Sequence, residues 1–184
     1  MASNEMTTAK RNTIVLVMLI SAFVAMLNQT ILNTALPAII KGLNITETTA
    51  QWLITGFMLV NGIMIPLTAF LMDKYTTRKL YIFSMAAFLI GSIIAALSPG
   101  FEILMVARII QAIGAGILLP LMQFTVFTLF PVEKRGFAMG LTGIVAQTAP
   151  AIGPTLTGLL IDFFSWRMPF YIVAAIALIA FAIG

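Results

Sequence analysis

The chain has 184 residues, of which 61% are hydrophobic and only 9% are charged, and its mean hydropathy is +1.09. A soluble domain of this length could not bury so much apolar surface, so the composition excludes an ordinary soluble fold and predicts a membrane protein. The net charge is +4, and the absence of cysteine and histidine excludes disulfides, a Cys/His zinc site and a Ser-His-Asp triad within this chain.

Six apolar segments follow one another along the chain and are joined by short loops. We expect spans at residues 14–36, 51–72, 80–97, 103–130, 137–163 and 168–184, the last truncated where the chain stops. All six should be helices, because a lipid-facing strand could not satisfy its backbone, so the fold class is an all-α membrane protein. Residues 1–13 form an N-terminal tail. The alternative for this start is a signal peptide, which five further spans disfavour.

The positions of Lys and Arg predict the orientation of the chain. Only Lys41 and Arg167 are expected in loops on the outer side of the membrane, and Arg108 lies within a span. The cations expected on the other side are Lys10, Arg11, Lys74, Arg78, Lys79, Lys134 and Arg135. The positive-inside rule therefore places the N-terminus in the cytoplasm and the protein in the cytoplasmic membrane. The net positive charge then reflects orientation, and we expect no nucleic-acid partner.

Two related loops indicate an internal repeat. Asp73 precedes Arg78 by five residues, and Asp162 precedes Arg167 by the same interval. The two loops are separated by three predicted spans. An odd number of spans turns the second copy upside down in the membrane, which predicts two inverted three-helix repeats, an arrangement typical of secondary transporters.

Polar residues inside the spans carry the functional signal. Asn28, Gln29 and Asn33 follow an apolar run in the first span, and Arg108 and Gln111 lie one turn apart in the fourth. A charge at this depth costs about 2.5–3.5 kcal/mol on insertion scales, so Arg108 should face the bundle interior or water. The alternative is that Arg108 is a structural residue whose side chain reaches toward the membrane surface.

The fifth span is rich in glycine and proline. Gly136, Gly140 and Gly143 form a thin face, a pattern that often indicates only helix packing. Pro150 and Pro154 flank Gly153 in mid-membrane, where prolines weaken the helix ladder and are tolerated only beside compensating neighbours or a cavity.

These segments together resemble the N-terminal half of a major facilitator superfamily transporter, most closely the drug:proton antiporter branch with fourteen helices. The resemblance covers the whole chain. It rests on residues 27–37 in the first span, on Leu71, Asp73, Lys74 and Arg78 in the following loop, on Arg108 and Gln111 in the fourth span, and on Ala149, Pro150, Gly153, Pro154 and Gly158 in the fifth.

The resemblance implies a six-helix N-terminal bundle that exports lipophilic, often cationic, drugs by alternating access, in exchange for protons. The implied partners are the small-molecule substrate, protons, the lipid bilayer and the C-terminal half of the same transporter, with no cofactor and no metal. The implied substrate and proton pathway comprises Asn28, Gln29, Asn33, Arg108, Gln111 and Gln147. The implied gating residues are Asp73, Arg78, Lys134, Arg135, Asp162 and Arg167. The implied antiporter motif comprises Pro150, Gly153, Pro154 and Gly158.

Several positions depart from the family pattern. Asn28 stands where the first-helix motif has an acid, and Ala69, Thr76 and Ala112 replace glycines. No acidic residue lies deep within a predicted span. Proton coupling would therefore need a carboxylate from the absent second half, or one of the peripheral acids Asp73, Glu102 and Asp162.

Two alternatives remain open at this point. A solute symporter or uniporter of the same fold differs from an exporter in direction, and only the resemblance of the fifth span argues against it. An intramembrane enzyme would need paired carboxylates, a metal cluster or an activated nucleophile within the spans, and the sequence contains none of these there.

Overall fold

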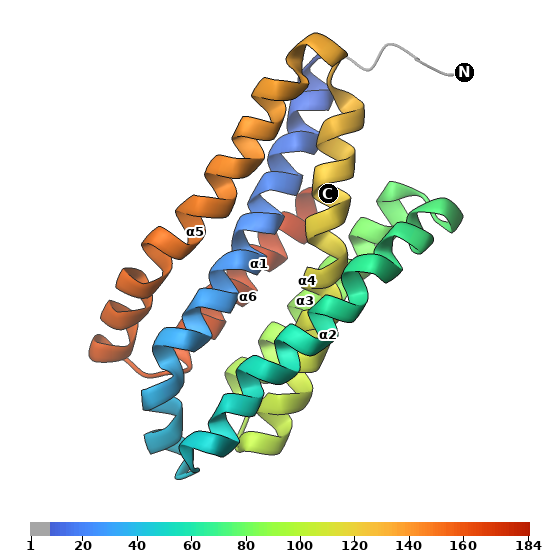
Figure 1. Ribbon diagram of the computed structural model, residues 1–184. Helices are drawn as coiled ribbons and strands as arrows, with labels where there is room; N and C mark the ends of the chain where they lie inside the picture. The colour runs from blue at the N-terminus through green and yellow to red at the C-terminus, as the bar shows by residue number, and fades with distance from the viewer. Residues whose placement is uncertain (1–7) are drawn as a thin grey trace.

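The computed structural model describes residues 8–184, and this part of the chain is helical throughout (Figure 1). The helices are α1 Thr8–Leu43, α2 Glu47–Lys74, α3 Thr77–Leu97, α4 Phe101–Leu129, α5 Arg135–Phe163 and α6 Met168–Ile183, with a short 3-10 turn at Val132–Lys134. The prediction of an all-α fold with six helices is confirmed. Of the predicted tail, residues 8–13 belong to α1 and residues 1–7 lie outside the described part.

The helices extend beyond most of the predicted span limits. α1 is the largest case, since it continues through Pro37 to Leu43. Hydropathy marks only the stretch that prefers hydrocarbon, whereas a helix continues into the interface as long as its backbone bonds are satisfied. Helices α1 to α5 are long and apolar enough to cross a membrane, while α6 has 16 residues.

Local signals in the sequence explain where the helices begin and end. Thr46 and Thr76 are the N-caps of α2 and α3, and their hydroxyls accept hydrogen bonds from the backbone N–H groups of Thr49 and Lys79. A capping hydroxyl satisfies one of the free N–H groups of the first turn. Asn44 makes the turn after α1 at a φ of 52°, in the left-handed region that asparagine tolerates.

The packing of the helices follows the predicted inverted repeat. α1 packs against α5 and contacts α6, while α4 packs against α2 and α3. Exchanging the unit α1–α3 for α4–α6 maps the first pair of contacts onto the second, and the α1–α4 and α3–α6 contacts map onto themselves. Figure 1 shows the same grouping, with α5 alongside α1 and α2 alongside α3 and α4.

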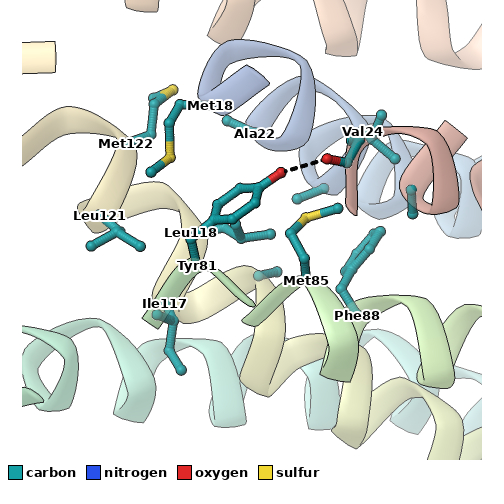
Figure 2. Close-up of a cluster of buried hydrophobic side chains, with 14 of the residues drawn as sticks. Met18, Ala22, Val24, Tyr81, Met85, Phe88, Ile117, Leu118, Leu121 and Met122 are labelled. Atoms are coloured by element: carbon teal, nitrogen blue, oxygen red, sulfur yellow. Dashed lines mark hydrogen bonds between the residues drawn. The ribbon is translucent and has the colours of Figure 1, made fainter. Parts of the chain in front are cut away.

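Two apolar clusters form the core. The inner cluster, toward the end of the bundle where α1 begins, includes Met18, Val24, Tyr81, Met85, Phe88, Leu118 and Leu121 (Figure 2). The outer cluster, toward the opposite end, includes Leu32, Ile39, Leu53, Ala95, Leu104 and Phe170. Each cluster joins side chains of both three-helix units, so the two repeats share one core.

Helices α3 and α4 approach each other very closely. A Cβ atom added at Gly91 would lie 2.8 Å from the carbonyl oxygen of Ala107 and 2.7 Å from the Cγ of Gln111. Only glycine fits such a contact without moving a backbone. Small residues at helix interfaces are a common device of membrane bundles, where close packing replaces the hydrophobic driving force.

Candidate functional site

A chain of hydrogen bonds runs from α4 to α3 in the middle of the bundle. The Nη1 of Arg108 donates to the Oε1 of Gln111 at 2.8 Å, and the Nε2 of Gln111 donates to the Oγ of Ser92 at 3.0 Å. The Ser92 hydroxyl in turn donates to the carbonyl oxygen of Phe88 at 2.8 Å. Every member is fully or almost fully buried. The amide of Gln111 therefore connects a buried cation on one helix to the backbone of its neighbour.

An aromatic ring provides the second contact of Arg108. The guanidinium carbon lies 4.1 Å from the centroid of the Phe57 ring on α2. Arginine suits such a site because its planar cation can stack on a ring while its edge makes hydrogen bonds. No carboxylate within residues 8–184 pairs with this cation. Arg108 thus joins three helices through an amide and a ring, and its positive charge is not neutralised by any described residue.

Asn28 lies in α1 with its amide completely buried. Neither its Oδ1 nor its Nδ2 has a hydrogen-bond partner, and the Nε of Arg108 also lacks one. A buried polar group without a partner costs about 1–3 kcal/mol of stability, so these atoms destabilise the observed arrangement. Asn28 and Arg108 therefore form no hydrogen bond with each other in this structure.

Asn28, Ser92, Arg108 and Gln111 occupy one level of the bundle. On α1, Asn28 follows Leu27 of the inner cluster and precedes Leu32 of the outer cluster. On α3, Ser92 lies between Phe88 of the inner cluster and Ala95 of the outer one, and the two polar residues of α4 fall between Ala107 and Ala112 in the same way. We call these four residues the polar layer. It lies where the two apolar clusters meet.

The predicted pathway residues thus fall into two groups. Asn28, Arg108 and Gln111 belong to the buried polar layer. Gln29 is half-buried, and Asn33 and Gln147 are exposed on the outside of this bundle. The structure does not bring the two groups together.

The outward face of α5 carries most of its glycines and prolines. Around Gly136, Gly140 and Gly143 there is open space, and Pro150 and Pro154 are exposed. Gly158 is half-buried and also borders open space.

Gly153 differs from the other residues of the predicted antiporter motif because it is buried against α1. A Cβ atom at this position would collide with the hydroxyl of Thr30. That hydroxyl donates to the carbonyl oxygen of Leu27 at 2.8 Å. The motif therefore provides one close contact inside the bundle and several small residues outside it.

The end of the bundle where α1 begins carries seven cations, and we call it the basic end. These are Lys10, Arg11, Lys74, Arg78, Lys79, Lys134 and Arg135. Several of them rest on aromatic rings, with Lys74 4.3 Å from the centroid of Phe70 and Arg135 4.2 Å from that of Phe127. Asp73, one of the predicted gating residues, forms no ion pair within the described chain. Lys134 is exposed in the turn before α5.

At the opposite end, the loop between α5 and α6 joins three helices. The Nη2 of Arg167 donates to the carbonyl oxygen of Ser98 at 2.9 Å, at the end of α3. The neighbouring Trp166 ring lies directly against Gly42 near the end of α1. Asp162 is exposed and makes no ion pair in the described range. Of this predicted gating pair, only Arg167 has a bonded partner.

A family comparison identifies the architecture. The Major Facilitator Superfamily model matches residues 18–184. The chain belongs to this superfamily. The predicted family is confirmed, and with it a multi-pass membrane protein of a transporter family rather than of an enzyme class.

Two curated relatives of the superfamily come from Bacillus subtilis (strain 168). The chain is 54% identical over 169 residues to the uncharacterised MFS-type transporter YcnB, covering 92% of this chain and 36% of the relative. It is 44% identical over 171 residues to the lincomycin resistance protein LmrB, and the match covers 93% of this chain and 36% of that protein. The chain therefore spans about a third of the length of these relatives.

A solved structure confirms the fold. The chain superposes on the peptide transporter POT (E310Q mutant, in complex with sulfate) with a TM-score of 0.83. The match covers 97% of this chain and 38% of the transporter, at 13% sequence identity. At that identity the likeness concerns the major facilitator fold alone.

Sequence reasoning missed three residues around Arg108. Phe57, Gly91 and Ser92 were not singled out, although each contacts Arg108 or Gln111 in the structure. The Gly91-Ser92 pair was a usable signal, because adjacent small residues in an apolar span mark close helix contacts. Phe57 offered none, since one phenylalanine among many apolar neighbours carries no positional information.

Proposed function

We propose that this chain forms the N-terminal half of an efflux transporter that exports lipophilic, often cationic, compounds across the cytoplasmic membrane. The observation that supports export of such compounds is the 44% identity with a protein named for lincomycin resistance. Membership of the superfamily supports a second helical bundle that faces this one, with a substrate site between them. The basic end would be cytoplasmic.

The second bundle would face the outward sides of α2 and α5. Small residues there leave room for another helix, and α5 has open space around Gly136, Gly140 and Gly143. The exposed Asn33 and Gln147, with the half-buried Gln29, supply polar groups on the outside of this bundle. These residues would line the cavity between the bundles.

The polar layer would act as the internal support of this half. Arg108 has one unpartnered nitrogen and Asn28 has an unpartnered amide, so a second set of hydrogen bonds is available to them. Alternating access needs two arrangements of comparable free energy, and an incompletely bonded layer lowers the cost of changing between them. Arg108 and Gln111 would then contribute to transport by positioning α3 and α4, and would meet substrate or protons only in another conformation.

Proton-coupled antiport would need a carboxylate outside this layer. Asn28 cannot titrate, so the coupling acid would come from the second bundle or from a peripheral residue such as Asp73 or Asp162. At the cytoplasmic side, Asp73, Arg78, Lys134 and Arg135 would contribute to closing the inner gate. At the outer side, Arg167 would hold α6 to the end of α3.

Drug accumulation in cells that express the full-length protein tests this proposal. Cells should accumulate less lincomycin, or less of a fluorescent lipophilic cation, than cells without the protein, and a protonophore should abolish the difference. Control cells express the same protein with Arg108→Ala, and immunoblots of the membrane fraction establish equal amounts. Greater accumulation in expressing cells would instead favour a solute symporter or uniporter.

A further inference from the structure

The carbonyl oxygen of Gly116, inside α4, lacks its usual partner within the helix. In an α-helix it would accept a hydrogen bond from the N–H group four residues later, but that residue is Pro120, which has no N–H. Gly116 is buried. A buried carbonyl oxygen in a membrane helix needs another donor, because neither water nor lipid can satisfy it there.

Thr68 of α2 supplies that donor. Its hydroxyl lies 3.2 Å from the carbonyl oxygen of Gly116 and 2.7 Å from that of Met64, one turn earlier in its own helix. The side chain of Thr68 is completely buried. A hydroxyl has a single hydrogen, so the two carbonyl oxygens share it or receive it in turn. The bond between the helices can therefore be made and released while Thr68 keeps a partner within α2.

Pro120 differs in its surroundings from the other prolines inside helices. It is half-buried, whereas Pro37, Pro66, Pro150 and Pro154 are exposed. Proline is a common cause of kinks, because it removes a hydrogen bond from the helix ladder and its ring crowds the preceding turn. The weak point of α4 therefore lies inside the bundle, where a neighbouring helix bonds its free carbonyl oxygen.

Helix α4 is in close contact with both of its neighbours just before this weak point. A Cβ atom added at Gly116 would lie 2.5 Å from the Cβ of Met64 on α2, and one added at Gly114 would lie 2.5 Å from the carbonyl oxygen of Ser84 on α3. Such contacts hold the part of α4 that carries the polar layer. A bend at Pro120 would leave that part in place and move the part that leads to the basic end.

Thr68 also lies close to the proposed inner gate. It precedes Asp73 by five residues, in the last two turns of α2 before the loop to α3. Its bond to Gly116 therefore connects the end of α2, and the gating loop that follows, to the helix that carries Arg108.

We propose that Thr68 is a positioning residue that makes Pro120 a hinge of α4. Its hydroxyl replaces the N–H that Pro120 lacks. Exchange of that hydrogen between Gly116 and its own helix allows α4 to bend while α2 stays in contact with it. This role rests on the proposed alternating access, but on neither the substrate nor the direction of transport.

A double-mutant cycle tests whether the hydroxyl replaces the missing N–H. Thr68→Val keeps the shape of the side chain and removes the hydroxyl, and Pro120→Ala restores the N–H. In the full-length protein, purified in a maltoside detergent, Thr68→Val should lower the melting temperature by at least about 2 °C. It should lower it much less when Pro120→Ala is also present, because Gly116 then has a partner within α4. Thr68→Ser keeps the hydroxyl and should stay closer to the wild-type value.

Thr125 of α4 provides the matched control. It is also buried, and its hydroxyl donates to the carbonyl oxygen of Leu121 at 2.7 Å within the same helix. Thr125→Val removes a hydroxyl without breaking a bond between helices. It should lower the melting temperature less than Thr68→Val, and by the same amount with and without Pro120→Ala.

Spin labels near the basic end report the bend and need no substrate. Phe83 on α3 and Phe127 on α4 are both exposed, and Phe127 lies beyond Pro120. Labels are attached to Phe83→Cys and Phe127→Cys in a full-length protein without other cysteines. Pro120→Ala should narrow the distribution of distances between the labels. Thr68→Val should broaden it, and Thr68→Ser should reproduce the wild-type distribution.

Transport kinetics separate a hinge from a purely structural contact. A straighter α4 should slow the conformational step and leave substrate binding intact. Pro120→Ala should therefore lower the maximal rate of efflux at least about threefold, with little change in the half-saturating concentration. The melting temperatures and label distances need no export, so a failure of the proposed drug efflux is distinguishable from a failure of the hinge.

Three results would overturn the proposal. An equal effect of Thr68→Val with and without Pro120→Ala, or an equally large effect of Thr125→Val, would show that the hydroxyl does not replace the N–H. An unchanged distance distribution for Pro120→Ala would show that α4 does not bend there, and wild-type efflux by that variant would show that the bend has no part in transport. If Thr68→Val alone is not recovered from membranes, its recovery together with Pro120→Ala supports the proposal, and its loss there refutes it.

Discussion

At the scale of single residues, Arg108 is held by two contacts of different kinds. Its contacts need both the hydrogen-bonding edge and the flat face of a guanidinium, because Gln111 takes one and Phe57 the other. A lysine supplies a compact charge with neither feature. The local chemistry therefore depends on arginine itself and not merely on a positive charge.

We expect Arg108→Ala to abolish drug efflux and Arg108→Lys to recover less than about a tenth of it, because the Gln111 amide loses its charged partner inside the bundle. Efflux is measured in cells with equal amounts of membrane-inserted protein. Phe57→Leu is the matched control, since it removes the ring and leaves the hydrogen bonds, and it should retain more activity than Arg108→Lys. Normal efflux by Arg108→Ala would show that the polar layer has no part in transport.

Asn28 stands where the first-helix motif that the chain resembles has an acid. We expect Asn28→Asp to be tolerated, because the new carboxylate would lie in the same layer as an arginine without an anionic partner, and to make efflux more sensitive to pH. The test is efflux from vesicles across a pH series. Asn44→Asp, in the exposed turn after α1, is the control and should leave the profile unchanged. An unchanged profile for Asn28→Asp would remove this position from the proton pathway.

At the scale of elements, α5 has two faces with different requirements for small residues. Gly153 is pressed against Thr30 of α1, whereas Gly143 borders open space in this half. A methyl group at the first position must displace a neighbour, and overpacking of this kind costs about 1–3 kcal/mol.

We therefore expect Gly153→Ala to lower the melting temperature of the purified protein and Gly143→Ala to leave it nearly unchanged. If the second bundle packs on this outward face, Gly143→Ala should still reduce efflux, because it narrows a contact between bundles. Wild-type efflux by Gly143→Ala would argue that this face of α5 meets lipid.

The helices and loops also show which features of the structure can be predicted from the sequence. Six helices, their order and the repeat could be predicted because apolar length and the recurring Asp–Arg loops are properties of the chain alone. The partners of Arg108 could not, because Phe57 and Ser92 come from other helices and the rotation of each helix is set by packing. Asp73 and Arg78 share a loop, yet their spacing could not reveal that neither forms an ion pair within the described chain.

At the scale of the whole molecule, the arrangement depends on orientation in the membrane. The seven cations of the basic end face a single aqueous side, and the two apolar clusters lie between the ends of the bundle. The proposal for the gate requires this end to be cytoplasmic, which is the side that the positive-inside rule assigns to it.

The chain contains no cysteine, so single cysteines can report this orientation without background labelling. Asn44→Cys and Pro99→Cys lie in exposed turns at one end, and Thr76→Cys and Glu133→Cys lie in exposed turns at the other. In intact cells an impermeant thiol reagent should label the first pair, and it should reach the second pair only after permeabilisation. Cells carrying the unmodified sequence are the control and should remain unlabelled. Labelling of the second pair from outside would show that the protein has the opposite orientation, and the proposed inner gate would then lie on the outer side of the membrane.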